Sequence, residues 1–135
     1  MATVITDNKN CYSYYDHDLM IMHSQFKGIF NYELFKEHTL NVIRFNGSNQ
    51  ILGGLIDFRK LRGSFFKILE HLEKEVQPKL QAQGFNIQAF VVSDDLLTAN
   101  VTEKLTEKFR SHKGNVKMFT DIDEANKWLM EMINA

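Results

Sequence analysis

Aromatic and branched residues flank a short polar cluster in the stretch CYSYYDHDLMIMHSQF at residues 11–26. Aromatic and branched residues are enriched in strands, whereas the polar residues Asp16, His17 and Asp18 favour a turn. The stretch therefore predicts two strands that pair as a hairpin around this turn.

Apolar residues recur at intervals of three and four in four later segments, which is the spacing of one face of a helix. Polar residues that can cap a first turn precede these segments. The predicted helices span about 31–46 after Asn31, begin at Ser64, follow Asp94 or Asp95 as far as Gly114, and follow Asp121. In the last helix Trp128 lies on the apolar face and is expected to be largely buried.

Short apolar runs at 51–58, 86–92 and 116–119 lie between the helices. They recur at intervals of about 30 residues, the length of a strand plus a crossover helix, so we expect parallel strands with right-handed connections. The predicted fold class is α/β, with a five-stranded, mostly parallel sheet, an antiparallel first strand and four helices. Residues 11–135 are expected to form this single domain, and residues 1–10 a flexible N-terminal segment.

Composition narrows the class of protein. Sixteen Lys and Arg against seventeen Asp and Glu give a net charge of −1, which provides no overall attraction for nucleic acid. The single cysteine, Cys11, excludes an intrachain disulfide and fits a reducing compartment, so a cytoplasmic location is expected. No apolar run approaches the roughly 18 residues that a membrane span needs.

Recognisable catalytic and metal-binding patterns do not occur in the sequence. Its five histidines lack metal-ligand spacing, and there is no P-loop or Gly-x-Ser-x-Gly turn. His38 lies on the apolar face of the first helix, which favours a hydrogen-bonded core histidine over an acid–base catalyst. Gly53 and Gly54 indicate a close approach between a helix and their strand. We therefore predict no catalytic residue, metal or cofactor.

Polar residues gather where the predicted parallel strands end, and ligands of such sheets bind beyond the carboxyl ends of the strands. Two arginines beside a helix start could hold an anion. The alternative is structural, with helix caps and a surface arginine paired to Asp57 or Asp94. The candidate binding residues are Asp57, Arg59, Arg62, Ser64 and Ser93.

Both faces of the predicted sheet carry large apolar side chains, since neighbouring strand residues point to opposite faces. Leaving several of them in water would cost about as much as the whole stability of a domain. Helices must therefore cover both faces, or the second face forms a homodimer contact or an apolar ligand site. Met20, Met22 and Phe26 are the candidates for that second role.

Two segments, GGLIDFRKLRG at residues 53–63 and VKMFTDIDEANKWL at residues 116–129, resemble the STAS superfamily in its SpoIIAA-like branch, also described as STAS/SEC14-like. The resemblance implies a superhelix of β-α turns and a protein that binds a partner or ligand without catalysis. The Asp-Ser-x-Gly segment of the phospho-switched members is not matched, because Asp57 and Ser64 lie seven residues apart.

The expected function is a non-catalytic regulatory or ligand-binding module for a protein partner or a small apolar or anionic ligand. One alternative is a phosphoserine partner switch at Ser64. Another is a small enzyme that uses the residues at the strand ends, which would require Arg59, Ser64 and Ser93 to line one enclosed pocket.

Overall fold

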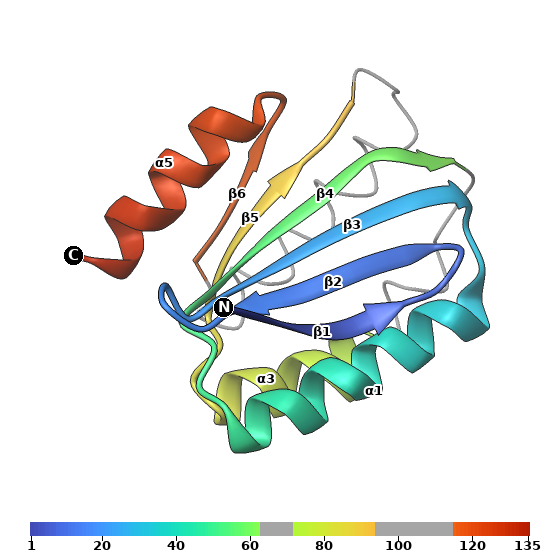
Figure 1. Cartoon of the computed structure of the whole chain (residues 1–135), viewed down its shortest axis with the longest axis horizontal. Coiled ribbons are helices and arrows are strands. Elements are labelled where there is room, and N and C mark those ends of the chain that lie inside the picture. The colour runs from blue at the N-terminus through green and yellow to red at the C-terminus, as the bar shows by residue number, and fades with distance from the viewer. Residues whose placement is uncertain (63–71, 94–114) are drawn as a thin grey trace.

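The structure, a computed structural model, describes residues 1–62, 72–93 and 115–135. A six-stranded sheet, with its strands in chain order, organises these residues (Figure 1). Strands β1 to β3 pair antiparallel, and β3 to β6 pair parallel. The strands are β1 (Ala2–Asp7), β2 (Cys11–Asp16), β3 (Ile21–Ile29), β4 (Gly53–Arg62), β5 (Ile87–Val91) and β6 (Asn115–Phe119). The α/β class is therefore confirmed.

Strand β1 makes the sheet one strand larger than predicted and occupies most of the segment that was expected to be flexible. It pairs with β2 from Ala2 opposite Asp16 to Asp7 opposite Tyr12, with a bulge between Val4 and Thr6. The residues from Thr3 to Thr6 are all β-branched, which favours a strand. This signal was available in a segment that otherwise looks polar.

The predicted hairpin between β2 and β3 is confirmed, although its loop is longer than expected. The Asp16 carboxylate accepts hydrogen bonds from the backbone N–H groups of Asp18 and Leu19, at 2.9 and 3.2 Å. Met20 closes the loop with a φ of 59°. Leu19 and Met20 were expected to belong to the second strand, but β3 begins only at Ile21.

Strand β4 continues past the predicted end near residue 58 as far as Arg62. Its pairing with β3 shifts register, from Gln25 opposite Asp57 to Lys27 opposite Lys60. Two residues of β4 thus oppose the single residue Phe26, as in a β-bulge. The candidate residues Asp57, Arg59 and Arg62 consequently lie within the strand, not in a loop after it.

The described residues contain three α-helices and one π-helical turn, against four predicted helices. They are α1 (Tyr32–Ser48), η1 (Leu72–Val76), α3 (Gln77–Ala82) and α5 (Ile122–Ile133). Asn31 caps α1 by accepting a hydrogen bond from Leu34 N at 3.0 Å, and Asp121 caps α5, as predicted. The start of the helix predicted at Ser64, and the whole helix predicted after Asp94 or Asp95, lie outside the described residues.

The helices lie on both faces of the sheet (Figure 1). On one face of the sheet, which we call the inner face, α1 and α3 cover a core that contains Met22, Phe26 and Phe58. We call the opposite face the outer face. On the outer face, α5 packs on β4, β5 and β6, where Ala125 and Leu129 are fully buried against Leu55 and Val91, among others. A helix therefore covers the second face over these three strands, which is one of the predicted alternatives.

Helix α5 approaches the sheet closely at Gly53, as the paired glycines predict. A Cβ atom there would lie 2.8 Å from Leu129 Cδ1 and 3.0 Å from Ile133 Cδ1. Trp128 lies at the rim of the same helix face. It is half-buried instead of largely buried, with its ring centroid 5.7 Å from that of Phe119.

Candidate functional site

The carboxyl ends of β3 and β4 carry four cationic side chains around one open cleft of about 450 Å³. We call it the cation cleft. The residues that line it are Lys27, Gly28, Arg59, Lys60, Leu61, Arg62 and Ser93. Leu61 points into the core, so its neighbours Lys60 and Arg62 point to the outer face. Lys27 pairs with Lys60 across the sheet and lies on the same face.

The charge of the exposed Arg59 side chain is largely neutralised by the buried carboxylate of Asp57. Its Nε and Nη2 atoms donate to the two carboxylate oxygens of Asp57 at 3.0 and 2.8 Å, and its backbone N–H donates to the same carboxylate at 2.9 Å. The hydrogen bond to Asp57 raises the pKa of Arg59. Asp57 is buried, and the pairing of Arg59 with Asp57 is the one that the structural alternative predicted.

Within the part of the chain that the structure describes, the other cations of the cleft have no such counter-charge. Among the ion pairs within residues 1–62, 72–93 and 115–135, none involves Lys27, Lys60 or Arg62. All three side chains are exposed or nearly so at the strand ends. Three positive charges around one cleft, with no acidic partner among the described residues, can attract an anionic group. Arg59 and Ser93 line the same cleft, but it is open to solvent, whereas the predicted enzyme would need an enclosed pocket.

The outer face of the sheet is aromatic beside this cleft, in strands β2 and β3. Tyr12 pairs with Gln25 and Tyr14 with His23 across β2 and β3, so all four point to the same face. The rings of Tyr14 and His23 stack with centroids 4.8 Å apart and an interplanar angle of 10°, and Tyr12 lies 6.0 Å from Tyr14. We call Tyr12, Tyr14 and His23 the aromatic platform.

A second open cleft, of about 240 Å³, lies over the aromatic platform. Leu55 and Ile122 border it on the side of α5, and Asp57 and Arg59 also line it. Arg59 therefore belongs to both clefts, which adjoin on one face of the sheet. The platform residues were not predicted as site residues. The alternation Tyr12, Ser13, Tyr14 was a usable signal, but the sequence does not say which face α5 covers.

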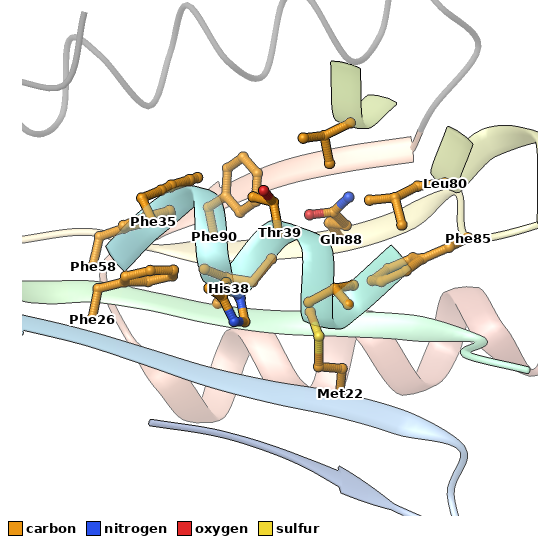
Figure 2. A pocket seen from close by; sticks show the side chains of 13 residues that line it. Met22, Phe26, Phe35, His38, Thr39, Phe58, Leu80, Phe85, Gln88 and Phe90 are labelled. Atoms are coloured by element: carbon orange, nitrogen blue, oxygen red, sulfur yellow. The ribbon is translucent and has the colours of Figure 1, made fainter. Parts of the chain in front are cut away.

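The inner face holds a partly open cavity of about 60 Å³ between the sheet, α1 and α3 (Figure 2). Its walls are mainly aromatic and aliphatic, and they include Met22, Phe26 and Phe85. The side chains of Gln88 and Thr39 point into it (Figure 2). Gln88 is 4% exposed. The cavity is thus apolar with a small polar part.

His38 is buried at the wall of this cavity, as predicted. Its Nδ1 lies 2.8 Å from the Thr6 hydroxyl, which also accepts a hydrogen bond from Asn41 Nδ2 at 3.1 Å. Thr6 can then donate its own proton to Nδ1. Burial lowers the pKa of His38 to about 4, so the ring is neutral near pH 7. This histidine joins α1 to β1 and has the structural role that its position on the helix indicated.

The structure divides the predicted site residues into several groups. Asp57, Arg59, Arg62 and Ser93 gather at the clefts, whereas Ser64 lies outside the described residues. Met22 and Phe26 are core residues of the inner face, and Met20 packs partly buried against the same core. Helices α1 and α3 cover that face (Figure 1), and Met22 and Phe26 line its apolar cavity, so the role of these residues in an apolar ligand site stays a prediction.

The described residues contain no group of three or more His, Cys, Asp or Glu side chains that could hold a metal ion. Among these residues there is also no helix that is long and apolar enough to cross a bilayer. Comparisons with protein-family models, with curated proteins and with solved structures found no match. The resemblance to the STAS superfamily therefore stays a prediction from the sequence motifs.

Proposed function

We propose that the chain is a non-catalytic binding module whose ligand or protein partner carries negative charge and docks at the cation cleft. The observation behind this proposal is that Lys27, Lys60 and Arg62 surround one cleft without an acidic partner among the described residues. Exposed like charges that lie close together repel one another, which destabilises the protein without a ligand. A bound anion reduces that repulsion.

The position of the cleft supports the same proposal. It lies at the carboxyl ends of parallel strands, where ligands of open α/β sheets bind. Its openness to solvent favours docking of a partner or ligand over a reaction that must exclude water. The phosphoserine switch at Ser64 remains an alternative, and mass spectrometry of the protein from its native cells tests it directly.

The test is calorimetric titration of the full chain with inorganic phosphate and with a short polyglutamate peptide at low salt. We expect saturable binding of at least one of them, and at least tenfold weaker binding by the double variant Lys60→Gln/Arg62→Gln. The control is Lys79→Gln/Lys127→Gln, which removes the same net charge from exposed residues of α3 and α5. Equal binding by both double variants would contradict the proposal.

A second candidate is binding of a small apolar molecule in the cavity of the inner face, which its mainly apolar walls and the polar side chain of Gln88 favour (Figure 2). The cavity could fix the orientation of a ligand by one polar group while enclosing its apolar part. A thermal-shift series with short alcohols tests this candidate. Stabilisation by a fitting alcohol that disappears when Val42→Phe fills the cavity would support it, and no shift with any alcohol would exclude it.

A further inference from the structure

One large apolar side chain is exposed beside the cation cleft. Ile29, the last residue of β3, is 80% exposed and, after Met1, is the most exposed large apolar residue in the part of the chain that the structure describes. It pairs with Arg62 of β4, where the ends of β3 and β4 lie side by side (Figure 1). A single exposed isoleucine is ordinary on a protein surface, so its surroundings decide whether it has a role.

Cationic side chains surround Ile29. Lys27 lies two residues before it on β3, which is roughly 7 Å along the strand. Lys60 and Arg62 lie opposite Lys27 and Ile29 on β4. The loop between β1 and β2 accepts a hydrogen bond from Lys27 N at 2.9 Å and adds the exposed Lys9 at the same end of the sheet. We call Lys9, Lys27, Ile29, Lys60 and Arg62 the basic edge.

The buried side chain of Asn10 fixes the backbone of this edge. Its Nδ2 atom donates to the carbonyl oxygens of Lys27 and Ile29, the latter at 3.0 Å, and its Oδ1 atom accepts from Asn31 N at 2.8 Å. Gly28 has a φ of 77°, a conformation that favours glycine. The backbone that carries Ile29 is therefore ordered before any partner binds, which lowers the entropy cost of binding.

Acidic groups near the basic edge do not neutralise it among the described residues. Glu33, at the start of α1, forms an ion pair with a lysine of its own helix at 3.3 Å. Asp7 lies in the row of the sheet that precedes Lys27. The carboxylate of Asp121 caps α5. Because the whole chain has a net charge of −1, a negative surface attracts this edge and repels the rest of the molecule, which orients the protein.

We propose that the basic edge docks on an anionic lipid bilayer, with Ile29 inserted beneath the headgroups and the four cations held at lipid phosphates and carboxylates. The inference rests on the proposed function and names an anionic membrane surface as the ligand. A bilayer presents negative headgroups over an apolar layer, which matches an aliphatic side chain among cations. Protein interfaces, in contrast, are enriched in aromatic residues and depleted in lysine, and most cations of the basic edge are lysines.

The test is co-sedimentation of the full chain with vesicles of phosphatidylcholine alone or with about one-third phosphatidylserine. At low salt we expect saturable binding to the anionic vesicles only, and weaker binding as salt is added. Lys60→Gln/Arg62→Gln should weaken this binding at least about tenfold, because each cation near an anionic surface contributes to the affinity. The control Lys79→Gln/Lys127→Gln, at exposed positions elsewhere, should bind nearly as the unchanged chain does.

The variant Ile29→Ser distinguishes a bilayer from other anions. It removes the apolar side chain and leaves every charge, so binding to anionic vesicles should fall about tenfold. Its affinity for inorganic phosphate and for polyglutamate should stay unchanged. Ile29→Leu should bind vesicles as the unchanged chain does. The matched control is Leu19→Ser, which removes an aliphatic side chain that is 44% exposed at the opposite end of the sheet.

Each outcome distinguishes this inference from the proposed function. Binding of phosphate or polyglutamate without binding of vesicles would overturn the inference and leave the cation cleft as proposed. Vesicle binding that Ile29→Ser does not change would also overturn it, since charge alone would then suffice. Absence of saturable binding by any anionic probe would overturn both. An acidic peptide with leucines that binds more tightly than the vesicles, and depends on Ile29, would replace the bilayer by a protein partner. Circular dichroism checks that each variant keeps the fold.

Discussion

At the scale of single residues, burial determines the chemistry of the titratable groups in the core. Cys11 begins β2 and is only 1% exposed, and burial raises the pKa of its thiol to about 12. Thiol reagents attack the thiolate, so both the low thiolate fraction and the lack of access protect this side chain.

We therefore expect Cys11 to react with a thiol reagent at a rate limited by opening of the structure. In buffer at neutral pH, the folded protein should react at least a hundredfold more slowly than the same chain in denaturant. The measurement is the time course of modification at increasing denaturant concentration. A folded protein that is modified as fast as free cysteine would show that the start of β2 is exposed in solution.

Single-residue roles could be predicted only where one local pattern decides them. The caps Asn31 and Asp121 and the core histidine His38 follow from their place in a helical repeat. The pairing of Asp57 with Arg59 was foreseen as an alternative, but its geometry depends on the β4 bulge. The aromatic platform depends on which half of a sheet face a distant helix covers, and no local pattern contains that information.

At the scale of elements, the packing of α5 on the sheet depends on small residues in β4. Gly53 lies beneath Leu129 and Ile133 of α5, and an added methyl group would also lie 3.3 Å from the Ile87 carbonyl oxygen. Because Leu129 is fully buried, it cannot easily move aside. The glycine thus sets the distance between helix and strand.

We expect Gly53→Ala to lower the free energy of unfolding by about 1 to 3 kcal/mol, as overpacked cores do. Denaturant titration of both proteins measures this difference. The matched control is Gly47→Ala in α1, where the nearest atom to a new Cβ is Gln83 Nε2 at 3.4 Å. Alanine in a helix should leave stability unchanged or raise it by roughly 0.5 to 1 kcal/mol. Similar losses in both variants would refute close packing at Gly53.

Element types were more predictable than element ends. The hairpin, α1, β5, β6 and α5 follow from hydrophobic period and caps, which are local signals. Strand β1 was missed although its run of β-branched residues is a local signal for a strand. The length of β4 was missed because pairing with neighbours, rather than apolar content, extends the strand through Lys60. Tertiary pairing overrides local preference in this way at sheet edges and bulges.

At the scale of the whole molecule, the burial of His38 makes the free energy of unfolding depend on pH. The folded protein holds the ring neutral, with a pKa of about 4, whereas the unfolded chain restores a value near 6.5. Below pH 6.5 the unfolded chain therefore binds a proton that the folded protein does not, and folding loses free energy as the pH falls.

We expect His38 to cause no loss in the free energy of unfolding above pH 6.5. The loss should grow as the pH falls through 6 and 5, and level off below about pH 4 at roughly 3 kcal/mol. The measurement is the free energy of unfolding from denaturant titrations between pH 4 and 7.5. Carboxylates titrate at the lower end of this range, so the comparison is with His38→Gln, whose amide cannot be protonated there. The variant should be less stable at pH 7.5, because the contacts of the ring are lost, but should lose less stability on acidification. Parallel curves for the two proteins would mean that His38 can be protonated in the folded state, and that the contact between α1 and β1 opens without unfolding the rest of the sheet.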